Sequence, residues 1–358
     1  MPHKPASHWR VQALMIAAAT LGGAGFNSLG VPGGWLSGAM IALALLAALK
    51  RAEPLSDPLR QIAMIASGTA IGSAMTPQMM QGIGRYPLTL ALMAVAVVAI
   101  TAVGALILRR VPGFSRETAF FASVPGALSY VFAVAANTQA DMARIAVVQV
   151  LRIFFLMALL PMVIVEAGVK LAPPSILPFD PPLTVALVIG LGTMAGYGLE
   201  RMKVAGGMLF GAMLASGLLH ATGFAPGRLP AIVAIAGQLL VGAWSGARFV
   251  GFDWRLLARL LLVSLGSFGV TMALAAGFAA MATFGLGVPF AQALLAFAPG
   301  GLEAMTILAF ALGVDPLFVG AHHLARFVMI SLGLPFVARY WLARPPPGSL
   351  GGKGTLER

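Results

Sequence analysis

Cysteine is absent from this chain of 358 residues. Disulfide bonds, zinc sites built on thiolates and thiol catalysis are therefore excluded. Histidine is scarce too, with five residues, three of which stand at positions 3, 8 and 220. Copper and iron enzymes need clustered histidine and carboxylate ligands. We therefore expect no metal site, no cofactor and no enzyme activity.

Charged residues are also few, at 9% of the chain, where soluble domains carry about 25%. Hydrophobic residues make up 59%, which suits a lipid-facing surface better than a hydrated one. The formal net charge is +12, from 23 Lys and Arg against 11 Asp and Glu. Because the basic residues stand singly or in pairs between apolar runs, they indicate the positive-inside bias of membrane proteins. We expect lipid, and no nucleic acid, as the partner of this surface.

Twelve apolar stretches can be marked along the chain, and most are long enough to cross about 30 Å of hydrocarbon as a helix of about 20 residues. They lie near 11–29, 33–49, 59–80, 86–108, 117–137, 142–166, 182–199, 204–220, 229–249, 256–284, 289–312 and 317–342. The expected fold is an all-α polytopic membrane protein. Residues 345–358, which begin with three prolines, are predicted to be a disordered cytoplasmic tail.

The chain repeats itself at a period of about 170–174 residues. The segment 33–40 (GGWLSGAM) returns as 206–213 (GGMLFGAM), and 124–128 (VPGAL) returns as 298–302 (APGGL). Three less common residues recur in order at an offset of 174: Asp141 as Asp315, Arg152 as Arg326, and Pro161 as Pro335. The sequence therefore predicts two membrane repeats, over 1–172 and 180–344.

The distribution of Lys and Arg indicates how the two repeats are oriented. If all twelve stretches cross and the N-terminus is inside, 14 basic residues fall inside and seven outside. If stretches 117–137 and 289–312 each enter and leave on one side, the count becomes 18 inside and three outside. Each half then crosses five times and the second is inverted, as in secondary transporters. Both termini would be cytoplasmic, in an inner or plasma membrane, although another non-crossing stretch in each half would give the same inversion.

The two Pro-Gly sequences are the first candidates for a functional site. Pro125 and Gly126 in the first half, and Pro299, Gly300 and Gly301 in the second, should interrupt their helices. Backbone groups freed at membrane depth must face protein or a water-filled cavity. One break in each inverted half predicts a substrate or ion site near the midplane. The alternative is an ordinary kink.

Glu303 lies just after the second break. A carboxylate within hydrocarbon costs about 2.5–3.5 kcal/mol, so such groups commonly mark ion or proton paths. Its counterpart in the first half is Ser129, a neutral hydroxyl, which makes the halves chemically unequal. We expect Glu303 to be a coupling group. The alternative is a glutamate at the water interface.

Arg152 and Arg326 sit about ten residues into long apolar stretches, each with a polar neighbour one turn earlier, Gln149 and His323 respectively. A guanidinium can hold a carboxylate through two hydrogen bonds, either that of a substrate or that of Glu303. The alternative is an arginine that braces the fold by donating to the carbonyls of a broken helix. The sequence leaves these two roles open.

Asp141 and Asp315 precede the last helix of each half, where an N-cap is a more ordinary role than cation binding. His322 and His323 are adjacent, so their side chains point about 100° apart on a helix and do not chelate one ion together. Glycines four apart are interpreted as close helix packing, in the pairs Gly34 with Gly38 and Gly207 with Gly211.

The repeated Gly-Gly-x-Leu-x-Gly-Ala-Met segment, together with the duplicated Pro-Gly break, resembles the AbrB-type duplicated membrane family of bacteria, from about Val11 to Arg344. That family is grouped with the cation:proton antiporter and anion transporter superfamily, whose members use inverted five-helix repeats with broken crossing helices. The resemblance implies an elevator-like secondary transporter, ion- or proton-coupled, with its site at the breaks, 124–128 and 298–302. The paired intramembrane aspartates of sodium/proton antiporters are missing, which puts cation antiport in doubt. An organic anion or a neutral solute therefore stays open as the substrate.

Members of that family often carry the labels ammonia monooxygenase or regulator. Three functions are therefore compared: a transporter of a small solute, a membrane sensor that acts on gene expression through a partner, and a monooxygenase. The scarcity of histidine disfavours the last. The sequence leaves the substrate and the oligomeric state open, with a homodimer as one assembly to test.

Overall fold

The computed structural model describes residues 5–74, 86–126, 128–166 and 178–337. The tail predicted over 345–358 and the loop around Lys170 lie outside these ranges. Within them the chain forms α-helices joined by turns and irregular segments, with an isolated bridge between Phe179 and Arg228. The predicted all-α fold is confirmed.

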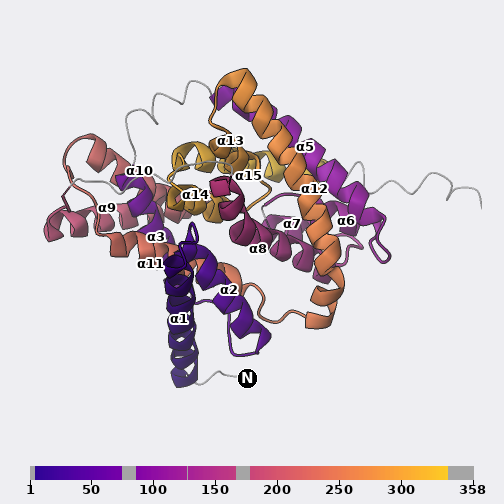
Figure 1. Ribbon diagram of the computed structural model, residues 1–358, viewed down its shortest axis with the longest axis horizontal. Helices are drawn as coiled ribbons and strands as arrows, with labels where there is room; N and C mark the ends of the chain where they lie inside the picture. The colour runs from indigo at the N-terminus through magenta and orange to yellow at the C-terminus, as the bar shows by residue number, and fades with distance from the viewer. Residues whose placement is uncertain (1–4, 75–85, 127, 167–177, 338–358) are drawn as a thin grey trace, which may run out of the picture.

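Seven described helices belong to each half of the chain (Figure 1). In the first half these are α1 (Pro5–Ser28), α2 (Gly34–Ala48), α3 (Asp57–Ser73), α5 (Tyr86–Arg109), α6 (Arg116–Ser123), α7 (Leu128–Ala135) and α8 (Met142–Glu166). In the second they are α9 (Pro182–Arg201), α10 (Gly207–Ala221), α11 (Ala231–Ala247), α12 (Trp254–Leu286), α13 (Phe290–Phe297), α14 (Leu302–Ala311) and α15 (Pro316–Val337).

Five of the described helices are long and apolar enough to cross a membrane: α5, α8, α9, α12 and α15. Shorter apolar helices accompany them, among them α2, α10, α11 and α14. Large apolar side chains face outward on the long helices, as Leu262 and Phe284 of α12 do at 78% and 90% exposure. Such a surface suits lipid and not water. The protein is a polytopic membrane protein.

The helices of the two halves correspond one to one. Helix α2 begins at residue 34 and α10 at 207, an offset of 173; α6 begins at 116 and α13 at 290, an offset of 174. The turns correspond as well: Gly33 before α2 and Gly206 before α10 both have left-handed backbones, with φ of 63° and 68°. The inverted orientation of the second half stays a prediction.

The two halves interlock to form two groups of helices (Figure 1). In one group, α1–α3 pack against α9–α11. Neighbouring helices of this group bring backbone against backbone at glycine residues, and we call it the glycine-packed group. Gly242 of α11 lies on the Leu36 carbonyl of α2, and Gly68 of α3 lies on the Leu209 carbonyl of α10. The interpretation of the small-residue pairs as close packing is confirmed, since Gly38 lies on the Gly22 carbonyl in the same way.

The other group contains α5–α8 and α12–α15, and we call it the broken-helix group. Helix α12 packs against α5, α8 and α13, and α15 packs against α13 and α14. The two groups meet along one seam, where α2 and α11 contact α8, and α3 and α11 contact α14.

Candidate functional site at two facing helix breaks

Both Pro-Gly sequences interrupt their helices, as predicted. Helix α6 ends at Ser123 and α7 begins at Leu128, while α13 ends at Phe297 and α14 begins at Leu302. Stretches 117–137 and 289–312 are therefore each two short helices and not one. Proline supplies no N–H to continue the helix, and both Pro125 and Pro299 are buried. The interruptions lie inside the protein and not at its surface.

The two breaks face each other. A β-carbon placed on Gly126 would lie 3.3 Å from the carbonyl oxygen of Gly300 and 3.6 Å from Nη2 of Arg326. The backbone of Gly126 is left-handed, with φ of 79°, a conformation that glycine adopts without the steric cost that a β-carbon brings. The backbones of the two halves thus come together at Gly126 and Gly300.

Each buried arginine holds the end of a broken helix. Nη2 of Arg152 donates to the Val124 carbonyl at 3.1 Å, and Nη1 of Arg326 donates to the Ala298 carbonyl at 2.6 Å. Nη2 of Arg326 also donates to the carbonyl of Gly300. Val124 and Ala298 are the C-caps of α6 and α13, where a helix leaves acceptors unpaired and its dipole favours a cation. The bracing role, left open by the sequence, is present in both halves.

The polar neighbours of the two arginines are equivalent as well. Nε2 of Gln149 donates to the Phe121 carbonyl at 2.8 Å, and Nε2 of His323 lies 3.0 Å from the Leu295 carbonyl. Nδ1 of His323 lies 2.6 Å from Nη2 of Arg326. Because a carbonyl only accepts and a guanidinium only donates, His323 is the neutral tautomer with its proton on Nε2. Gln149 therefore joins α8 to α6, and His323 joins α15 to α13, the helices that lead into the two breaks.

Glu303 is one of the two carboxylate partners that the sequence leaves open for the buried arginines. It lies in the first turn of α14, partly buried, where the helix dipole favours a carboxylate. Within the described ranges no ion pair joins it to Arg152 or Arg326. Arg248 follows α11, the helix of the glycine-packed group that α14 contacts, and its Cζ lies 4.4 Å from the centroid of the Trp244 ring. The Glu303 carboxylate and the Arg248 guanidinium interact through their charges, without an ion pair within 4 Å.

Arg248 is the site residue that sequence reasoning missed, because it follows an apolar helix like any other basic loop residue. Glu303 and Arg248 come from opposite sides of the seam between the two groups, since α14 meets α11 there. Gly301 caps the start of α14 with an extended backbone. The side chain of Ser129, the predicted counterpart of Glu303, lies outside the described part of the structure.

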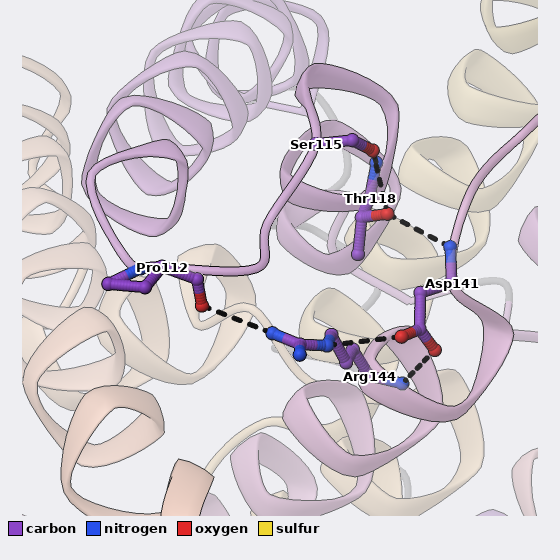
Figure 2. Close-up of polar contacts among 5 residues, drawn as sticks. All are labelled: Pro112, Ser115, Thr118, Asp141 and Arg144. Atoms are coloured by element: carbon purple, nitrogen blue, oxygen red, sulfur yellow. Dashed lines mark hydrogen bonds and ion pairs between the residues drawn. The ribbon is translucent and has the colours of Figure 1, made fainter.

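Asp141 caps α8, as the capping interpretation expects. Its Oδ1 accepts the backbone N–H of Arg144 at 3.0 Å, and its Oδ2 pairs with Nε of the same arginine at 3.0 Å. Figure 2 shows Arg144 between this carboxylate and the carbonyl of Pro112, to which Nη1 donates at 3.2 Å. The backbone N–H of Asp141 donates to Oγ1 of Thr118 at 2.9 Å. This network joins the start of α8 to the start of α6.

Asp315 caps α15 in the same manner, with Oδ1 accepting from the backbone amides of Leu317 at 2.9 Å and Phe318 at 3.1 Å. His322 is fully buried and lies 2.7 Å from Oγ1 of Thr89 through its Nε2, so it points to a different partner from its neighbour His323. Across the described residues no cluster of three His, Asp or Glu side chains could hold a metal ion.

Comparison with known proteins gives one family and two relatives. The family model described as "Transition state regulatory protein AbrB" matches residues 35–342, which include both breaks. The Escherichia coli (strain K12) protein named "Putative regulator AbrB" is 27% identical over 266 residues, 72% of this chain and 74% of that protein. "Uncharacterized protein YhjN" of Bacillus subtilis (strain 168) is 21% identical over 356 residues, 89% of this chain and 90% of that protein.

Proposed function

This chain belongs to the AbrB family, as the resemblance in its sequence implied, and from that premise we propose that it is a secondary transporter of a small solute. One observation carries the proposal: the two breaks, one from each half, meet inside a membrane protein at Gly126 and Gly300. Interrupted helices at equivalent positions of two repeats are where transporters with inverted repeats hold substrate and coupling ion. The bacterial inner membrane is the compartment we propose.

The mechanism we propose is alternating access by motion of one helix group against the other. The glycine-packed group is held by backbone contacts at Gly68 and Gly242, whereas the broken-helix group carries both breaks and both buried arginines. The two groups meet where α8 and α14 contact α2, α3 and α11. Motion along this seam would carry the two breaks past the glycine-packed group, which would stay fixed. This supports an elevator-like movement.

Glu303 and Arg248 are the groups we propose for ion coupling. They lie on the two sides of that seam, and their charges attract while Glu303 is ionised. Protonation of Glu303 removes the attraction, which makes the position of the broken-helix group depend on the proton. A proton-coupled flux would then follow from one carboxylate, without the paired aspartates of sodium/proton antiporters.

A second candidate function is a membrane sensor. The description of the family and the name of the Escherichia coli relative both refer to regulation. In this chain such a role would act on gene expression through a partner bound by residues 345–358, the tail predicted to be cytoplasmic. A partner that binds the whole protein and fails to bind a chain ending at Arg344 would favour the sensor.

The deciding experiment is solute uptake in proteoliposomes. The purified chain is reconstituted and a panel of labelled small cations, organic anions and neutral solutes is offered, with and without an imposed pH gradient. Saturable uptake above that of protein-free vesicles, altered by the gradient, supports the transporter. A panel that shows no uptake by the protein under either condition contradicts it. An enzymatic role, which we do not propose, would instead give chemically altered solute.

A further inference from the structure

A buried histidine and a buried aspartate face each other at one end of the glycine-packed group. His220 lies in the last turn of α10, and Asp180 lies just before α9. Nε2 of His220 is 3.4 Å from Oδ2 of Asp180, and the two side chains are 7% and 0% exposed. Among the described residues neither of these two atoms has a hydrogen-bond partner. The pair is separate from the breaks, which belong to the other helix group.

The other hydrogen bond of His220 fixes what its Nε2 presents to Asp180. Nδ1 of His220 lies 2.7 Å from the Ser216 carbonyl, and because a carbonyl only accepts, Nδ1 carries a proton. A neutral His220 therefore turns the lone pair of Nε2 toward Asp180, and an ionised Asp180 offers only acceptors. Two buried acceptors that face each other repel. One added proton, on either atom, turns the repulsion into a charge-assisted or neutral hydrogen bond.

Asp180 also fastens two segments of the chain to each other. Its Oδ1 accepts the backbone N–H of Gly227 at 2.8 Å, and its own backbone N–H donates to the Arg228 carbonyl at 3.0 Å. A β-carbon on Gly227 would lie 2.7 Å from that Oδ1, so this approach requires glycine. Asp180 thus joins the entry of α9 to the segment 222–230 between α10 and α11. Its contact with His220 joins both of them to α10.

The pair has no other ionised group to settle its charge within the described structure. Arg228 is the one further charged residue on segments 178–181 and 222–230, and its guanidinium stacks on Phe179, with Cζ 4.2 Å from the ring centroid. The charged residues of α3 and α9 stand at the opposite ends of those helices, at positions 57, 60, 200 and 201. An apolar cluster of Val188, Ala225 and Leu229 lies among the same segments. Asp180 and His220 are therefore each other's charge partner.

The packing of the repeat does not itself require a histidine at this place. Helix α2 begins at residue 34 and α10 at 207, so His220 corresponds to Ala47. In the first half a comparable contact joins His8 of α1 to Glu53, which lies between α2 and α3, with Nδ1 2.7 Å from Oε2. These two side chains are 40% and 37% exposed, so water can take the place of either partner. The enclosed pair of the second half has no such substitute.

We propose that Asp180 and His220 form a proton-binding site that fastens this end of the glycine-packed group at low pH and releases it as the pH rises. Histidine ordinarily changes its charge between about pH 5 and 8, and the C-terminal end of α10 favours the cationic form. With the proton bound, the pair attracts and holds residues 178–181 to α10; without it, two acceptors repel. In the predicted topology this end of α9 faces the outside. The site then responds to external pH, whether or not the protein transports a solute.

The experiment compares the Tm of the purified full chain with that of two variants over about pH 5.5 to 8.5, the range in which histidine ordinarily titrates. Asp180→Asn still accepts from Gly227, but its amide donates to a neutral His220 and repels a protonated one. His220→Gln offers a donor that does not titrate. Because the folded protein gains from the bound proton, we expect the wild type to be favoured over both variants at low pH. This advantage should shrink by about 3 °C as the pH rises.

His8→Gln is the matched control, because it removes the exposed histidine–carboxylate contact of the other half. Exposed pairs contribute little, so its Tm should differ from the wild type by a small amount that hardly changes with pH. A difference between wild type and Asp180→Asn that is equal at both ends of the pH range contradicts the proposal. If Asp180→Asn does not fold, the same comparison with His220→Gln decides.

NMR of the ring-labelled histidines gives a direct reading, since the chain has five of them. The signal that is absent from His220→Gln belongs to His220. We expect it to move from the protonated to the neutral position across the same pH range. A signal that stays in one position throughout overturns the site.

Discussion

Gly126 of the first half lies against Gly300 of the second, so that a β-carbon on Gly126 would be 3.3 Å from the Gly300 carbonyl oxygen. Arg326 donates to that same carbonyl. The carbonyl oxygen of Gly300 thus accepts a hydrogen bond from Arg326 of its own half and lies against the backbone of Gly126 in the other half. The fit of the breaks depends on the lack of a side chain at position 126.

Gly126→Ala should therefore damage the site. A β-carbon in the left-handed region costs about 1–2 kcal/mol, and here it also presses on the Gly300 carbonyl. We expect a lower Tm and loss of most solute flux. Gly301→Ala is the control, since its backbone is extended, with φ of −82°, and nothing lies within 4 Å of the added carbon. Equal flux in the two variants would show that the contact between the breaks is not needed.

Straightening either break should abolish transport without preventing insertion. Replacement of Pro125-Gly126 or Pro299-Gly300 by Ala-Ala restores amide donors and helix propensity, so the two short helices should join. We expect a protein that is present in the membrane at normal levels and carries no solute. Pro161→Ala, in the unbroken helix α8, serves as the proline control and should keep its flux. Undiminished flux in both double variants would reduce the breaks to kinks.

The pH dependence of flux should depend on Glu303. Glu303→Gln keeps the shape of the side chain and removes its charge, so the attraction to Arg248 is lost at every pH. We expect flux that no longer changes with pH, and the same flat profile in Arg248→Gln. The control is Glu200→Gln, whose carboxylate lies 3.9 Å from Nη2 of Arg60 at the end of α9. A Glu303→Gln protein with the wild-type profile would make this acid an interfacial residue without a coupling role.

The inversion of the second half can be tested by labelling, because the chain has no native cysteine. Arg201→Cys at the end of α9 is expected to be cytoplasmic and Gly285→Cys near the end of α12 to be outside. Both positions are exposed. Arg110→Cys should label from the same side as position 201. If positions 201 and 285 react with a membrane-impermeant maleimide from one side, the inverted repeat is wrong.

Much of the helix order could be predicted from hydropathy and repetition. Stretch 142–166 coincides with α8, and both interruptions fall at Pro-Gly. The partners of the charges could not be predicted in this way. The sequence puts Arg152 in an apolar helix and leaves its role open, because a sequence does not say which carbonyl faces a guanidinium. The placement of Glu303 across the seam from Arg248 depends on the contact of α14 with α11, which no local pattern encodes.

The hydroxyl groups of α12 are a further example of what the sequence conceals. Ser264 and Thr271 are ordinary residues in a long apolar helix, where hydroxyls commonly donate to a carbonyl one turn earlier. Thr271 does so, at 2.9 Å to Ser267, whereas Ser264 does not.

The glycine seams have a mechanical consequence. Gly68 and Gly242 each bring the backbone of their helix against the backbone of a neighbouring helix. At these points no side chains lie between the helices, so no change of rotamer could make room for sliding. Displacement along such a seam would drive main-chain atoms into one another within a fraction of an ångström. The six helices α1–α3 and α9–α11 are therefore a stiff frame, and their amides should exchange hydrogen as one cooperative unit. Any relative motion of the two helix groups should therefore take place at the contacts of α8 and α14 with this frame, where larger side chains meet it.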